Sequence, residues 1–126
     1  MKKTIFILAI FVSLSGCKKD KETASELIVG KWEWVKTVGP WTEVNPQTTG
    51  YSQTIEFQVS GIMKEFRNDS LIISTNYNIE SIPTLPDNYI LTYNTGSRTN
   101  FYIRRDTLVF NNVYIDGPVS TYIRSK

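Results

Sequence analysis

Hydrophobic and polar residues alternate along most of the chain after about residue 30. Ile55 and Phe57, for example, alternate with Thr54 and Glu56. A period of two is typical of strands with one buried face, and turn residues interrupt it at a spacing of roughly 8–12 residues, as in all-β domains. We therefore predict eight strands, over residues 31–38, 51–59, 62–68, 71–80, 88–94, 99–105, 107–115 and 119–125.

Eight antiparallel strands with one apolar face each must bury that face and also protect their edges. An open sheet of this size would leave both exposed, whereas closure into a barrel solves both problems. We predict an all-β fold, an eight-stranded antiparallel up-and-down barrel, with a two-sheet sandwich as the alternative. Two longer loops, 39–50 and 81–88, join strands, and residues 26–29 are compatible with a short helical turn.

The hairpin between the second and third strands fixes the register that we expect there. Ser60 and Gly61 fit a two-residue turn. That turn pairs Val59 with Ile62, Phe57 with Lys64, and Ile55 with Phe66. Apolar positions then fall on one face of both strands, as burial requires. Lys64 is the exception, and we expect it near the barrel mouth or with only its stem buried.

The N-terminus predicts export and lipid attachment. Two lysines precede an apolar run that is too short to span a bilayer as a helix, which is typical of a signal peptide. Leu14-Ser15-Gly16-Cys17 resembles the bacterial lipobox, and Cys17 is the only cysteine. We expect residues 1–16 to be removed and Cys17 to carry lipid such as palmitate. An ordinary secretory signal with an incidental cysteine is the alternative.

The mature chain then has two predicted parts, a flexible charged tether over residues 17–26 and one small domain over residues 27–126. Loss of Lys2 and Lys3 reduces the 14 basic residues to 12, which equals the 12 acidic residues. A neutral domain argues against nucleic acid as a partner. The chain has no histidine, which excludes Ser-His and Cys-His catalysis and zinc sites with histidine ligands.

Gly30-Lys31-Trp32, at the start of the first predicted strand, resembles the Gly-x-Trp signature of lipocalins. Further stretches resemble the small lipocalin-like lipoproteins of Bacteroidota, namely Thr54–Phe57, Gly61, Lys64–Asn68, Asn76–Ile79, Asp106–Phe110, Asp116–Pro118 and Tyr122–Arg124. The resemblance covers about residues 27–126 and implies an eight-stranded barrel on a lipoprotein of the outer membrane, facing the periplasm or the cell surface.

The same resemblance implies roles for three residues. Gly30 and Trp32 form the signature, and Trp32 would pack at the closed end of the barrel. Arg124 would lie over its ring as a cation–π partner. Full lipocalins are longer, with wider loops, a C-terminal helix and usually disulfides. The interior expected here is correspondingly smaller.

A small apolar ligand inside the barrel is the first functional hypothesis. The predicted inward residues are Trp32, Trp34, Ile55, Phe57, Phe66, Ile73, Tyr77, Leu91, Tyr93, Phe101 and Phe110. From these we select as candidate ligand contacts Trp34, Phe57, Phe66, Tyr77, Tyr93 and Phe101. The alternative is that they only fill the core, since an eight-stranded barrel is just wide enough to be filled or to hold one small ligand.

An interaction module on the cell surface or in the periplasm is the second hypothesis. Trp41 lies in the loop between Pro40 and Pro46, where an exposed aromatic residue could anchor a protein or glycan. An inhibitor role also belongs to this class. The alternative for Trp41 is a lid folded over the barrel end.

An enzyme is the third hypothesis. Glu56 and Glu65 would face each other across the Ser60-Gly61 hairpin, and paired carboxylates can hydrolyse glycosides. The predicted register turns both toward solvent, so we expect no catalysis. We also expect a monomer, with no cofactor and no metal ion.

Overall fold

The computed structural model describes residues 23–112 and 115–126. The predicted signal peptide, the lipobox with Cys17, and most of the predicted tether lie outside these residues.

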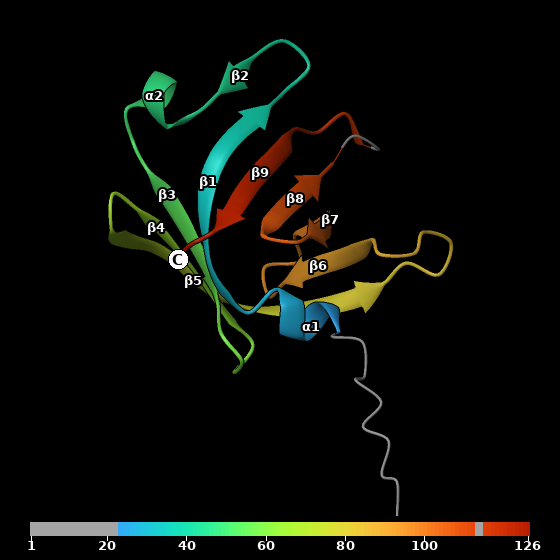
Figure 1. Cartoon of the computed structure of the whole chain (residues 1–126). Helices are drawn as coiled ribbons and strands as arrows, with labels where there is room; N and C mark the ends of the chain where they lie inside the picture. The colour runs from blue at the N-terminus through green and yellow to red at the C-terminus, as the bar shows by residue number, and fades with distance from the viewer. Residues whose placement is uncertain (1–22, 113–114) are drawn as a thin grey trace, which may run out of the picture.

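Eight strands form a closed antiparallel up-and-down barrel (Figure 1). Each barrel strand pairs with the next along the chain, and the last strand pairs back with the first. The fold class is therefore confirmed, and the sandwich alternative is wrong. In chain order the elements are α1 (Ala24–Leu27), β1 (Gly30–Val38), β2 (Glu43–Val44), α2 (Pro46–Thr49), β3 (Gln53–Phe57), β4 (Ile62–Arg67), β5 (Ser70–Ser81), β6 (Tyr89–Tyr93), β7 (Arg98–Arg104), β8 (Thr107–Asn111) and β9 (Val119–Arg124).

The first described helix lies within the segment predicted as a tether, residues 17–26. Thr23 caps α1 through a capping box, because its hydroxyl accepts from the Glu26 backbone while the Glu26 carboxylate accepts from the Thr23 backbone, both at 3.3 Å. Ala24 is buried. All described core residues lie between Ala24 and Tyr122, so the chain from Thr23 onward carries its own hydrophobic core.

Two short elements occupy the predicted 39–50 loop. β2 forms a two-residue pairing with the end of β1 and is not part of the barrel. Asn45 caps α2 by accepting from the Thr48 backbone at 2.9 Å, and Gly50 ends it in the left-handed region at φ 76°. These local signals are strong, but a single turn of helix has no hydrophobic period to reveal it.

One end of the barrel is closed by α1 and by the contact that the resemblance implies. Trp32 is fully buried, and its indole N–H donates to the Ile28 carbonyl at 2.7 Å. The Arg124 guanidinium lies 4.2 Å from the centroid of the Trp32 ring. The same guanidinium donates to the carbonyls of Leu27 at 2.7 Å and Val29 at 3.0 Å.

Gly30 is required at this end for two reasons. Its φ is +130°, which residues with a side chain rarely adopt. A Cβ there would also lie 3.0 Å from an Arg124 nitrogen. The glycine thus lets the arginine approach the backbone closely.

The predicted register of β3 and β4 is wrong by one residue. The connection is a four-residue turn, in which the Gln58 N–H donates to the Ile62 carbonyl and the Gly61 N–H donates to the Gln58 carbonyl. Gly61 takes a positive φ of 86°. Phe57 therefore pairs with Met63. Met63 competes with Lys64 for the interior and is the residue that is buried, as its lower cost of desolvation predicts.

This shift exchanges the two faces of β4. Phe66 pairs with Thr54 and faces outward, so the prediction that it lines the interior is wrong. Lys64 also faces outward, opposite Glu56. Glu65 pairs with the buried Ile55 and faces inward. Glu56 and Glu65 consequently lie on opposite faces and do not form the carboxylate pair considered above.

Candidate functional site in the barrel interior

The half of the barrel next to α1 is filled by side chains. Phe57, Leu91, Phe101 and Leu108 face inward and are at most 1% exposed. Phe57 packs edge-on against Tyr77, with ring centroids 5.1 Å apart. Two of the predicted ligand contacts, Phe57 and Phe101, are therefore core residues.

The other half of the interior is polar and aromatic, and we call it the far interior. Strand pairing places all but one of its side chains opposite other inward residues, and the exception, Tyr51, lies just before β3 and stacks on Trp34. The members are Trp34, Tyr51, Gln53, Glu65, Arg67, Ile73, Thr75, Tyr93 and Tyr122.

The wall of the far interior is open beside β5. The ladder between β5 and β6 begins at Tyr77, with one further hydrogen bond from the Asn94 N–H to the Asn76 carbonyl. Residues 70–75 therefore pair with β4 alone within the described chain. Ile73 faces inward opposite Glu65 and yet remains 45% exposed. Solvent thus reaches the far interior at this point.

Stacked aromatic rings form the opposite wall. Trp34 stacks on Tyr51 with ring centroids 5.7 Å apart. The Arg67 guanidinium lies 4.3 Å from the Tyr51 centroid. The Trp34 indole N–H donates to the Thr37 hydroxyl at 2.9 Å, and that hydroxyl lies 2.8 Å from the Ser120 hydroxyl. These contacts hold the ring faces in place.

Glu65 is the titratable acid of the far interior. Burial raises the pKa of its carboxyl, while the Arg67 charge opposes this shift. Burial also raises the pKa of Tyr93 and Tyr122 well above the usual range, and the Glu65 charge adds to both shifts. The two tyrosines therefore stay protonated.

Hydrogen-bond capacity is left over in this region. Tyr122 accepts from the Gln53 amide at 3.2 Å. Among the described residues, the Glu65 carboxylate and the Tyr93 hydroxyl have no hydrogen-bond partner, and neither is sealed from solvent. A polar ligand group could use both.

The structure brings only part of the predicted contact set together. Trp34 and Tyr93 lie in the far interior, and Tyr77 lies nearer α1, where its hydroxyl donates to the Gln58 carbonyl at 2.9 Å. Sequence reasoning placed Glu65 on the outer face and did not select Arg67 for the site. The signal that could have found them is the Met63, Glu65, Arg67 alternation, which requires the longer turn.

A groove of about 530 Å³ lies beside α1. Its apolar lining includes Val29, Val59, Tyr77 and Ile79. It is separate from the far interior, although Tyr77 contributes to its wall.

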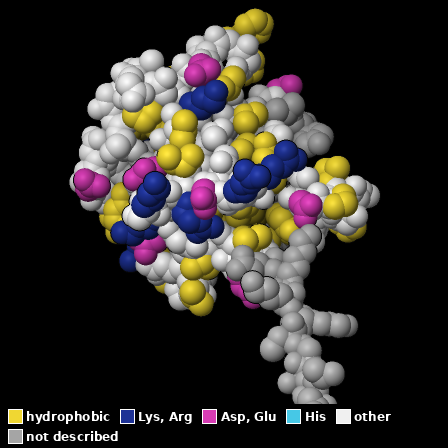
Figure 2. All heavy atoms as spheres, in the orientation of Figure 1, with side chains coloured by type: hydrophobic (Ala, Val, Ile, Leu, Met, Phe, Trp, Pro, Cys, Tyr) yellow, Lys and Arg dark blue, Asp and Glu magenta, His cyan; other side chains and the backbone are white. Residues whose placement is uncertain are grey.

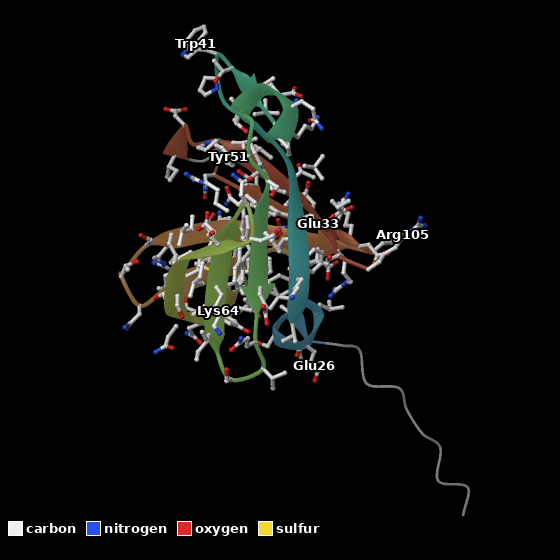
Figure 3. The ribbon with its side chains drawn as sticks, turned by 90° about the vertical axis from the view of Figure 1, so that its left-hand side faces the viewer. Glu26, Glu33, Trp41, Tyr51, Lys64 and Arg105 are labelled. Atoms are coloured by element: carbon white, nitrogen blue, oxygen red, sulfur yellow. The ribbon has the colours of Figure 1, made fainter. Side chains whose placement is uncertain are left out.

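Trp41 is 94% exposed, so the lid alternative is wrong. Figure 3 shows it at the tip of the loop after β1, at the opposite end of the molecule from Glu26 in α1. The side chain is thus free to meet a partner at the end of the barrel away from α1.

Charged side chains of both signs mix on the surface. Figure 2 shows Lys and Arg side chains across one face with Asp and Glu among them. This face lacks the single-sign field that phosphate binding needs. The described residues contain no cluster of three or more metal-ligating side chains, and no helix among them is long and apolar enough to cross a membrane.

Comparison with protein-family models, with curated proteins and with solved structures found no match for this chain.

Proposed function

We propose that this protein is an exported lipoprotein, acylated at Cys17 and anchored in the outer membrane. The support is the lipobox-like Leu14-Ser15-Gly16-Cys17 with its single cysteine.

Metabolic labelling with an alkyne palmitate analogue tests the anchor. The wild-type chain should take up label and sediment with membranes, and Cys17→Ser should lose both. A matched control combines Cys17→Ser with Ser25→Cys, which keeps one cysteine but moves it, and it should remain unlabelled. Labelling of that control would refute the assignment of Cys17.

The barrel in this proposal is a non-catalytic domain that binds one small molecule in the far interior. The observation that carries it is Ile73, which faces inward and is still 45% exposed. Apolar and aromatic walls with a few polar groups are usual in small-molecule sites. Trp34, Tyr51 and Tyr93 supply the rings, and Glu65 and Gln53 supply polar groups.

A neutral fluorescent probe, N-phenyl-1-naphthylamine, tests binding directly. Added to residues 18–126, it should gain fluorescence in a saturable manner, and octanol should displace it. Fluorescence that rises linearly without saturation, or that octanol does not reduce, would count against a defined site.

A second candidate function is recognition of a macromolecule on the side away from the membrane, and Trp41 favours it. Exposed tryptophans are enriched at the energetic centres of protein interfaces. Pull-downs with the wild-type domain should lose their specific partner with Trp41→Ala and keep it with Val44→Ala, a change at another exposed apolar residue of the same loop region. Identical pull-downs from both variants would remove this candidate.

A further inference from the structure

We propose that the far interior selects a small amphipathic molecule with an aromatic or apolar body and a cationic amine, and that the Glu65 carboxylate binds this amine. The inference rests on the proposed small-molecule function and names the chemical class of its ligand.

The position of Glu65 carries the proposal. It lies between Ile55 on β3 and Ile73 on β5, and all three side chains face inward. An ionised carboxylate can only accept hydrogen bonds. Because Glu65 has no such bond with any described residue, a ligand that meets it must donate.

Arg67 does not neutralise this acid by direct contact. Among the described residues, the ion pairs are Arg98 with Glu80 and Arg124 with Asp106. The Arg67 guanidinium instead lies over the Tyr51 ring. Arg67 is also exposed, whereas Glu65 is partly buried. Charge-assisted hydrogen bonds are stronger where water is excluded, so the acid should dominate selection over the arginine.

The groups that face Glu65 from the other strands are neutral. Tyr93 on β6 and Tyr122 on β9 stay protonated, as described above. Among the described residues, the far interior therefore contains one partly buried acid, Glu65, and one exposed cation, Arg67. A cationic group that enters beside Ile73 meets Glu65 directly across the strand ladder.

The other side chains of the far interior indicate the chemistry of the rest of the ligand. Tyr51, which stacks on the buried Trp34, adds an aromatic side chain, and Ile73 adds an aliphatic one at the opening. A molecule with one ring and a short arm to an ammonium group matches the chemistry of these side chains.

Three probes with the same ring and different polar ends test the proposal on residues 18–126. They are 2-phenylethylamine, 2-phenylethanol and 3-phenylpropionate, titrated by calorimetry at neutral pH and low salt. The amine should bind at least about tenfold more tightly than the alcohol or the acid, as expected for a hydrogen bond to a charged group.

Variants assign this preference to Glu65. Glu65→Gln should remove most of the preference for the amine, and Glu65→Asp should keep part of it because the charge remains. Glu56→Gln, the same change on the outer face of the neighbouring strand, should leave it unchanged. Amine affinity in the wild-type chain should fall as acidification protonates Glu65.

The outcomes separate the inference from the proposed function. Equal affinity for the three probes, tighter binding of the acid, or a preference that survives Glu65→Gln would overturn the inference while leaving a binding site. Failure of all three probes and of the neutral fluorescent probe would overturn the proposed function itself. The comparison of probes on the wild-type chain is decisive even if Glu65→Gln fails to fold.

Discussion

Glu65 lies directly across the β3–β4 ladder from Ile55, and both side chains point into the barrel. This pairing places an acid in an interior that the alternative register would have lined with Phe66. It changes the expected ligand from a purely apolar molecule to an amphipathic one.

The register itself predicts unequal roles for two phenylalanines. Phe57→Ala should cost about 3–5 kcal/mol of unfolding free energy, because the ring is fully buried. Phe66→Ala should cost about 1 kcal/mol or less, because that ring is half-buried on the outer face. Urea unfolding of the two variants measures this, and equal losses would contradict the observed pairing.

Glu65 should make stability depend on pH in a defined direction. Burial raises the pKa of Glu65 in the folded state, so the folded state binds the proton more tightly than the unfolded state. Its favourable contribution is therefore complete at acidic pH below the unfolded pKa, and it is lost as pH rises through the folded pKa. Glu65→Gln should accordingly raise Tm at neutral pH.

Thermal unfolding at neutral and acidic pH checks this sign. The gain from Glu65→Gln should shrink as the pH is lowered, because the wild-type carboxyl then becomes neutral as well. Glu43→Gln, on the exposed strand β2, serves as a control and should move Tm much less. A lower Tm for Glu65→Gln at neutral pH would show that the charge is stabilised in the folded state.

Arg124 should contribute far more to the free energy of unfolding than an ordinary surface arginine. Arg124→Ala removes the contact with Trp32 and leaves the carbonyls of Leu27 and Val29 without this donor, which should cost about 2–4 kcal/mol. Asp106→Asn removes only an ion pair at 3.7 Å to a largely exposed carboxylate and should cost less than about 1 kcal/mol. Denaturant unfolding with similar losses for both variants would argue against the closed end as described.

Two tryptophans provide a matched test of exposure. Trp34→Ala should cost about 3–5 kcal/mol, since the ring is buried and stacked on Tyr51. Trp41→Ala should stay within about 0.5 kcal/mol of the wild type, since its ring touches mainly solvent. A large loss of stability in Trp41→Ala, measured by urea unfolding, would indicate that this ring packs on the barrel after all.

The strands and the closure of the barrel could be predicted from sequence because alternation and edge protection depend on local pattern. The register of β3 and β4 could not. Met63 and Phe66 place apolar residues in opposite phases of the alternation, so the pattern allows a two-residue or a four-residue turn. The four-residue turn forms, because it buries Met63. Glu65 faces the interior as a consequence.

The exposure of Trp41 could not be predicted from the sequence either. A lid and an exposed anchor require the same residues in the same loop, and only the path set by β2 and α2 decides between them. The opening beside β5 depends on where β6 ends relative to β5, which is a long-range relationship that no local pattern encodes.

Native mass spectrometry of residues 18–126, after incubation with a lipid extract of the producing cell, tests most directly whether the far interior binds a small molecule. We predict a discrete adduct on the wild-type domain. Thr75→Trp, which adds a large side chain at an inward position opposite Met63, should abolish it. Ser74→Trp, the adjacent outward position opposite Lys64, should retain it. A bare mass for the wild type, or an adduct that survives Thr75→Trp, would contradict the account.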